Sequence, residues 1–259
     1  MPPPRYPSDL SDAEWTILEP LLSSAQKRGP PPEWPLRYVA DAVFYLLRSG
    51  CSWRMLPREY PPWQKVYYHF GKWRIDGRLH QAHDRLRGAV GEAEGRNRNP
   101  SAAAVDSQVV KTTPVGGPER GYDGAKRLAG RKRHILADTG GLVLAARVHG
   151  ANHLPDRDGG RRLLEGREGL SRTELLWADG AYTGGFREWL RHRLGWRPWR
   201  CPTTRTGSCG ATGWRRSHAA SGCCLAVGSW SAPSFAWLGL SRRLSKDYER
   251  LPETAEAMI

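Results

Sequence analysis

Apolar side chains recur at helical spacing in several short runs within residues 1–90. The first run follows Ser11, which forms a capping box with Glu14 at the expected start of a helix. Gly and Pro residues separate the runs, as they do between helices joined by tight turns. The expected helices follow Ser11, run from Leu36 to a stop at Gly50, follow Pro61-Pro62, and run from Gly77 to about Val90. This arrangement predicts a small all-α, helix-turn-helix-like domain.

The pattern changes to that of strands after residues 91–100, a polar segment with the composition of a linker. Strands are expected at 102–109, in a hairpin of 133–138 and 142–148, and before Asp179, with helices at 156–168 and 185–194. Strand, hairpin, helix, strand and helix is the element order of a ribonuclease H-like core. We therefore expect residues 101–259 to form a mixed sheet with flanking helices, an α+β or α/β domain.

Residues 197–234 follow neither the strand period nor the helix period. No Asp or Glu occurs from Trp189 to Lys246, although ten of the 40 Lys and Arg residues lie there. We expect residues 197–234 to be irregular and poorly ordered, with regular structure returning at Phe235.

The net charge of +14 and the pI of about 10.0 favour a polyanionic partner such as DNA. Outside the acid-free stretch the excess of basic residues is only four, so an arginine-rich surface without such a partner is the alternative. Nothing resembles a signal peptide and no apolar run is long enough to span a bilayer, so we expect a cytoplasmic protein with reduced cysteines. Paired Cys-x-x-Cys spacing, typical of zinc sites, is missing from Cys201, Cys209, His218, Cys223 and Cys224.

Two of the apolar runs end in an aspartate, Asp106 after residues 102–105 and Asp179 after residues 175–178. The carboxyl ends of neighbouring strands meet at one edge of an α/β sheet, where ligands bind. Two carboxylates at that edge supply the oxygen ligands that Mg²⁺ prefers, and paired metal ions catalyse phosphodiester chemistry. The alternative is that both aspartates only cap the turns that follow their strands.

Basic side chains close to these aspartates are candidates for contacts with DNA phosphates. Arg131, Lys132 and Arg133 form a compact cluster, and Lys111 and Lys126 are weaker candidates of the same kind. For the cluster, the alternative is a solvated start of a strand.

Two further groups of residues have both a functional and a structural interpretation. In the N-terminal domain we expect four basic residues to face DNA, Arg54, Lys65, Lys72 and Arg74. We expect four aromatic residues to form the core, Trp63, Tyr67, Phe70 and Trp73. The second group consists of His149 and His153 with Asp156 and Asp158, which are close enough in the sequence to suggest a metal site. Helix capping explains these aspartates better than metal binding does.

Several short motifs lie at and between the two aspartates, and two further motifs lie near the end of the sequence. They are Asp106–Thr113, Gly121–Lys126, Gly130–Leu136, Trp177–Tyr182, Phe235–Gly239 and Arg242–Glu249. Together they resemble bacterial insertion-sequence transposases of the DDE type, most closely the IS-five (IS4/IS5-type) family. The N-terminal helices, with Cys51–Pro57, resemble the DNA-binding module of that family. The resemblance covers roughly residues 8–196 and 235–259.

This resemblance implies a ribonuclease H-like catalytic domain that depends on Mg²⁺ (or Mn²⁺). It also implies cleavage and strand transfer at the terminal inverted repeats of a mobile element, with double-stranded DNA as the partner. We expect no membrane association, a homo-oligomer on DNA, and a location with the bacterial nucleoid.

Carried over residue by residue, the resemblance makes Asp106 the first catalytic aspartate and Asp179 the second. The third member should be a glutamate three residues before Phe235, but that position is Ala232. Pro233 would also disturb the helix that normally presents the glutamate. The departure falls within the acid-free stretch, and we hypothesise a pair of compensating frameshifts in the gene, near Arg197 and near Ser234.

The sequence therefore favours a transposase that has lost catalytic activity in this copy. The alternative is a non-catalytic DNA-binding remnant of a transposase, which acts through its N-terminal helices alone. A stand-alone ribonuclease H-like nuclease is disfavoured, because it would have no need of the helical DNA-binding module. Binding of the element's ends without Mg²⁺-dependent nicking would exclude the enzyme for this chain.

Overall fold

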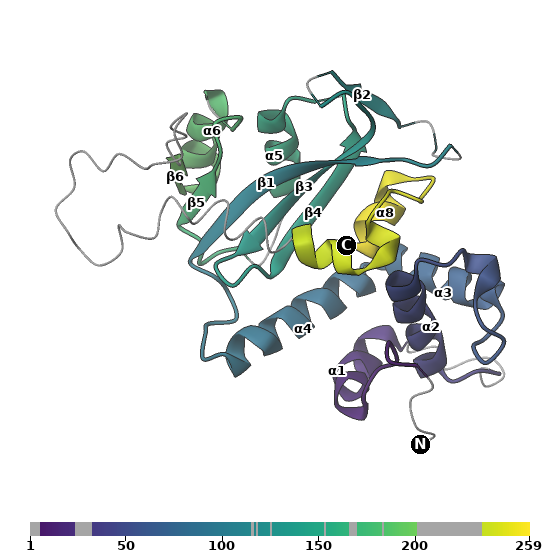
Figure 1. Cartoon of the computed structure of the whole chain (residues 1–259). Coiled ribbons are helices and arrows are strands. Elements are labelled where there is room, and N and C mark those ends of the chain that lie inside the picture. Colours follow the sequence, from purple (N-terminus) through teal and green to yellow (C-terminus); the bar gives the residue numbers. More distant parts are fainter. Residues whose placement is uncertain are drawn as a thin grey trace.

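The computed structural model describes residues 6–23, 33–114, 117, 119–124, 126–152, 154–165, 170–182, 184–200 and 235–259. Its N-terminal part is all-helical and confirms the predicted helices (Figure 1). They are α1 (Asp12–Leu22), α2 (Leu36–Ser49), α3 (Trp63–Ile75) and α4 (Arg78–Ala93), with a short 3-10 helix, η1 (Trp53–Met55), before α3. Helix α4 continues past its predicted end into the segment predicted as a linker.

Local sequence determines where two of these helices begin and end. The Ser11 hydroxyl accepts a hydrogen bond from the Glu14 amide, and the Glu14 carboxylate accepts one from the Ser11 amide, so the predicted capping box is confirmed. Gly50 ends α2 with a φ of 73°, a left-handed conformation that favours glycine. A Cβ atom at Gly50 would lie 2.8 Å from the Cβ of Arg242, so α2 ends directly against the C-terminal segment, residues 235–259.

The second part of the chain forms a six-stranded mixed sheet. Its strands are β1 (Ala102–Lys111), β2 (Gly121–Asp123), β3 (Leu128–Asp138), β4 (Val143–Gly150), β5 (Leu175–Ala178) and β6 (Arg197–Arg200). Strand β1 is central, antiparallel to β3 and parallel to β5, while β4 pairs antiparallel with β3 and β6 pairs parallel with β5. The short β2 pairs with the start of β3. With β2 set aside, the order β4-β3-β1-β5-β6 is that of the predicted ribonuclease H-like sheet.

Strand β6 corrects one expectation, because it lies in the stretch predicted to be irregular. Its residues pair in parallel with β5, from Leu175 opposite Arg197 to Ala178 opposite Arg200. Strand pairing uses backbone groups that every residue except proline supplies in full, so a run without side-chain periodicity can still join a sheet edge. The rest of the predicted irregular stretch, residues 201–234 with Ala232, lies outside the described residues.

The two faces of the sheet are covered differently (Figure 1). Helices α5 (Asp156–Leu164) and α6 (Gly185–Leu194) pack on one face, where Leu163, Phe186 and Leu136 share an apolar core. The C-terminal segment, with η3 (Arg242–Leu244) and α8 (Pro252–Met258), packs between the other face and the N-terminal helices. Both ends of the chain therefore share one core. None of the described helices has the length and apolar character needed to cross a membrane.

Candidate active site

Asp179 directly follows the last residue of β5, whereas Asp106 lies in the middle of the neighbouring strand β1, which continues to Lys111, so Asp106 caps no turn. β1 and β5 are parallel, and their last paired residues, Val105 and Ala178, immediately precede the two aspartates. Asp106 pairs with Ile135 of β3, and directly paired residues point to the same side of a sheet. Ile135 belongs to the core shared with the N-terminal helices and the C-terminal segment. The Asp106 side chain therefore lies on that face of the sheet, opposite α5 and α6.

Hydrogen bonds from the following residues orient both carboxylates. The Ser107 amide donates to Asp106 Oδ1 over 2.7 Å, and the Ala181 amide donates to Asp179 Oδ1 over 2.9 Å. The Tyr182 amide also reaches the Asp179 carbonyl over 3.3 Å, which closes a turn after β5. Asp179 therefore does stabilise its turn, as the capping alternative required, while both aspartates stay half-buried.

Behind Asp106 lies a buried polar group that the sequence did not reveal. The Ser107 hydroxyl donates to Asp156 Oδ1 over 2.9 Å, and Lys132 Nζ donates to the same oxygen over 3.0 Å. Burial raises the pKa of Asp156, but these hydrogen bonds outweigh it and hold the pKa below its ordinary value. Asp156 is therefore a carboxylate at neutral pH, and Lys132 balances its charge.

A chain of hydrogen bonds continues from Tyr182 through two histidines. His149 Nδ1 lies 2.8 Å from the Gly150 carbonyl and must donate to it, so His149 Nε2 accepts from His134 Nε2 over 2.9 Å. His134 Nδ1 then accepts from the Tyr182 hydroxyl over 2.9 Å. Burial and the neighbouring His149 hold the pKa of His134 well below its ordinary value, so the ring is neutral.

Tyr182 connects this chain to the aspartates. Its side chain is only 2 % exposed, and burial together with the negative charges of Asp156, Asp106 and Asp179 raises the pKa of its hydroxyl well above the usual range. The hydroxyl consequently stays protonated and donates to His134. Sequence reasoning missed Ser107, His134 and Tyr182 as site residues, although each lies inside one of the short motifs that carry the family resemblance.

The suggested metal site at His149 and Asp156 is corrected by the same contacts. Both ring nitrogens of His149 are hydrogen-bonded, and Asp156 bonds to Lys132 and Ser107. Capping, the other interpretation, is also not what the structure shows, because Pro155 precedes α5 and no side chain caps the helix start. His153 lies outside the described residues.

The basic cluster on β3 is also corrected. Arg131 and Arg133 are 0 % and 1 % exposed and have no surface to offer a phosphate. Arg131 donates to Asp247 and to the carbonyls of Glu249 and Arg250, while Arg133 donates to the carbonyls of Leu244 and Lys246. Lys132 points to the opposite face, toward Asp156. Of the five basic candidates, only Lys111 and Lys126 are exposed.

In the N-terminal helices, half of the eight predicted positions have the expected burial. Phe70 and Trp73 are buried as predicted, and Trp63 is half-buried. Tyr67 is instead 48 % exposed, because the buried stripe of α3 consists of Val66, Phe70 and Trp73. Of the predicted DNA-facing residues, Arg54 and Lys65 are exposed, whereas Lys72 and Arg74 are half-buried.

A third carboxylate that joins Asp106 and Asp179 is missing from the part of the chain that the structure describes. There, the one group of three His, Cys, Asp or Glu side chains close enough to share a metal ion lies elsewhere, on α4. Asp106 and Asp179 themselves fit Mg²⁺, because they are half-buried oxygen donors that follow paired residues of adjacent parallel strands. By position they match two of the three carboxylates that the family resemblance implies.

Comparison with known proteins identifies the family of the chain. The DUF4096 model, described as "Putative transposase of IS4/5 family", matches residues 10–83, the region of the N-terminal helices. The model of the transposase DDE domain matches residues 97–206, which hold both aspartates and the whole described sheet. No curated protein and no solved structure matches the chain. The two models together match more than two thirds of the residues, and the chain belongs to the IS4/IS5-type DDE transposases.

Proposed function

We propose that this transposase binds the terminal inverted repeats of an insertion sequence, and that Asp106 and Asp179 are its metal-binding catalytic carboxylates. The observation that carries the proposal is the pairing of Val105 with Ala178 on adjacent parallel strands, since the two aspartates are the next residues after this pair. Divalent metal ions, Mg²⁺ or Mn²⁺, would there activate the attacking water or hydroxyl and stabilise the leaving oxygen of a phosphodiester. The carboxylates of this chain would hold the metal, with Asp106 oriented by the Ser107 amide within β1 and Asp179 by the Ala181 amide in the turn after β5.

The buried polar residues serve, in this proposal, as positioning residues for the two aspartates. Ser107 follows Asp106 and is held by Asp156, while Tyr182 belongs to the turn of Asp179 and is held by His134. In this way α5 anchors the middle of β1 and β3 anchors the turn after β5, which restricts the movement of both segments. This arrangement favours a fixed separation of the two carboxylates.

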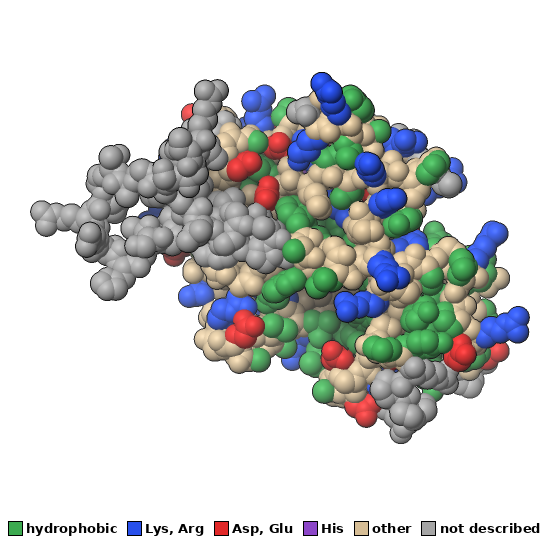
Figure 2. Space-filling model, in the orientation of Figure 1, with side chains coloured by type: hydrophobic (Ala, Val, Ile, Leu, Met, Phe, Trp, Pro, Cys, Tyr) green, Lys and Arg blue, Asp and Glu red, His purple; other side chains and the backbone are tan. Residues whose placement is uncertain are grey.

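Duplex DNA is the proposed partner, bound by exposed basic side chains. Lys111 and Lys126 lie on the catalytic domain, and Arg54 and Lys65 lie on the N-terminal helices. Figure 2 shows that Lys and Arg predominate over Asp and Glu on the right-hand half of the face in view. We also propose that the chain acts as a homo-oligomer on DNA, in the cytoplasm with the nucleoid.

For this copy, we propose that binding survives and cleavage does not. Ala232 and Pro233 occupy the positions where the family pattern requires a glutamate on a helix. A two-carboxylate site binds metal less tightly and lacks one group that orients it. The chain would then act as a DNA-binding remnant of a transposase.

A paired binding and nicking assay tests this proposal. We expect salt-dependent binding of a duplex that carries the element's ends, without Mg²⁺- or Mn²⁺-dependent nicking above the level of the double variant Asp106→Asn/Asp179→Asn. Nicking above that level would show an active enzyme, and nicking lost in the double variant would assign it to the two aspartates. Failure to bind the ends would overturn the proposal as a whole.

Metal binding tests the roles of the residues without any need for activity. Mn²⁺ affinity, followed by electron paramagnetic resonance, should fall strongly in Asp106→Asn and more weakly in Tyr182→Phe. Tyr182→Phe keeps the ring and removes only the hydroxyl that bonds to His134. Unchanged Mn²⁺ affinity in Asp106→Asn would refute the metal site, whereas unchanged affinity in Tyr182→Phe alone would refute the positioning role.

A further inference from the structure

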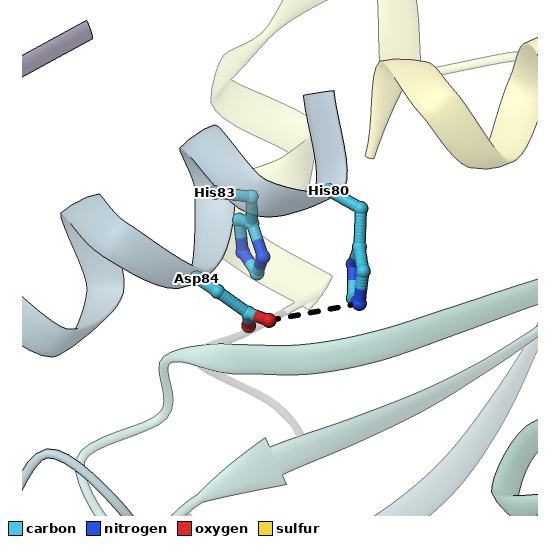
Figure 3. A group of neighbouring side chains, drawn as sticks. All are labelled: His80, His83 and Asp84. Carbon is cyan, nitrogen blue, oxygen red and sulfur yellow. Dashed lines mark ion pairs between the residues drawn. The ribbon is translucent and has the colours of Figure 1, made fainter. Parts of the chain in front are cut away.

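We propose that α4 carries a second metal site, formed by His80, His83 and Asp84, that binds a transition-metal ion such as Zn²⁺. Each residue offers one ligand atom, and the three atoms lie within 4.8 Å of one another. Figure 3 shows the three side chains on one side of the helix. The proposal is independent of the catalytic aspartates.

Helix geometry explains why these residues meet. Positions i, i+3 and i+4 of an α-helix share one face, so His80 lies next to both His83 and Asp84. His80 Nε2 is 3.6 Å from Asp84 Oδ2. A tetrahedral ion with bonds of about 2.0–2.2 Å keeps its ligand atoms roughly 3.3–3.6 Å apart. The His80–Asp84 pair already has this separation, and the ligand atom of His83 lies within 4.8 Å of both.

The donor chemistry selects the class of metal. Two imidazoles and one carboxylate suit Zn²⁺, Co²⁺ or Ni²⁺, whereas Mg²⁺ prefers oxygen ligands alone. The site on α4 and the aspartate pair should therefore take different ions from the same solution. His80 is exposed and His83 and Asp84 are half-buried, so a bound ion would keep open positions for water or for a further ligand.

The surroundings both support and oppose such a site. Arg87 Nε lies 3.7 Å from Asp84 Oδ1, which orients the carboxylate so that Oδ2 faces His80, although the positive charge lowers affinity for a cation. Another donor of the same guanidinium bonds to the Arg98 carbonyl over 2.9 Å and anchors it. His80 and His83 also line a pocket together with Glu253 and Glu256 of α8, and Glu256 is already paired there with Arg147 over 3.5 Å.

The alternative is that the three residues form only an ion pair within the helix, between His80 and Asp84. Such a pair would contribute little at the surface. Substitution of His83 separates the two explanations, because it removes a metal ligand and leaves the His80–Asp84 pair intact.

Calorimetric titration of the full chain with Zn²⁺ provides the test. The cysteines are alkylated beforehand, and excess Mg²⁺ is present, so that neither thiols nor the aspartate pair take up Zn²⁺. We expect one Zn²⁺ per chain, and an affinity lower by roughly tenfold or more in His83→Gln and His80→Gln, since loss of even an outer-shell partner costs that much. The matched control is His192→Gln, which changes an exposed histidine on α6 and should bind as the wild type does.

Two further readouts make the outcome decisive. Zn²⁺ should raise the melting temperature of the wild type but not of His83→Gln, because binding stabilises only the folded state. Bound Co²⁺ should give a visible spectrum of nitrogen and oxygen ligands, without the thiolate charge-transfer band. Equal Zn²⁺ affinity in wild type, His83→Gln and His192→Gln would overturn the proposal. Asp106→Asn/Asp179→Asn should leave Zn²⁺ binding unchanged, whatever its effect on DNA cleavage.

Discussion

Consecutive basic residues of β3 point to opposite faces of the sheet and have different partners on each face. Arg131 and Arg133 point to the face covered by the C-terminal segment, where backbone carbonyls surround them. Lys132 and His134 point to the face of α5 and α6, where a carboxylate and a tyrosine hold them. One face is closed by long-range chain packing and the other by a network of side chains. Three consecutive basic residues in a strand therefore cannot act as one patch, because the strand sends them to different sides.

The largest predicted effect on stability concerns Arg131, on the face covered by the C-terminal segment. Arg131→Met keeps much of the side-chain volume but removes the ion-pair partner of Asp247, which is 3.2 Å away and, like Arg131, fully buried. We expect a loss of about 3–5 kcal/mol in the free energy of unfolding, because a buried carboxylate is left uncompensated. Urea denaturation measures the loss, and Arg120→Met, at an exposed position, is the control. Unchanged stability with weaker DNA binding would instead restore Arg131 as a phosphate contact.

The second face is tested by a glycine of α5. A Cβ atom at Gly159 would lie 2.2 Å from His134 Nε2, the atom that bonds to His149. Gly159→Ala should therefore cost about 1–3 kcal/mol through overpacking and break the histidine chain. Thermal denaturation measures the cost, with Gly124→Ala as the control, since a Cβ there meets nothing within 4 Å. Equal stability of the two variants would mean that α5 does not hold His134 in place.

His134, on the face covered by α5 and α6, should make the free energy of unfolding depend on pH. The pKa of His134 is lowered by burial and by His149, so below about pH 6.5 the unfolded chain binds a proton that the folded chain does not. Stability is then full above that pH and falls as the pH decreases, by up to about 1.4 kcal/mol per pH unit. Urea denaturation between pH 7 and pH 5 measures this slope. The slope should flatten in His134→Gln and persist in His192→Gln, and equal slopes would contradict the role of His134.

The smallest expected effect concerns DNA binding by Lys126, an exposed side chain. Lys126 is exposed, and its replacement by alanine should leave stability unchanged while lowering the salt dependence of DNA binding by about 0.9 in the log–log slope. Fluorescence anisotropy over a range of salt concentrations measures the slope. Arg162→Ala, at an exposed position on α5, is the control. If both variants behave alike, Lys126 is not a phosphate contact.

Local patterns predicted much of this fold and part of the site. Periodicity and capping predicted the four N-terminal helices, the hairpin, the strand that contains Asp106 and the strand before Asp179, because each depends on nearby residues. A pattern also tells which side chains share a face, but not what covers it. Arg131 meets Asp247 across 116 positions, and His134 meets Tyr182 across 48, so no local signal could assign their partners. Strand β6 escaped prediction for a related reason, since its pairing needs no side-chain pattern.

The contact of Arg131 with Asp247 also sets the order in which the protein can be completed on the ribosome. Strand β3 is synthesised 116 positions before its partner, so its two arginines must remain hydrated until the end of the chain emerges. Closing so long a loop is slow compared with forming the hairpin. A product truncated before residue 244 would expose guanidinium groups in the middle of a sheet face. Residues 244–250 are therefore needed before this side of the sheet can close.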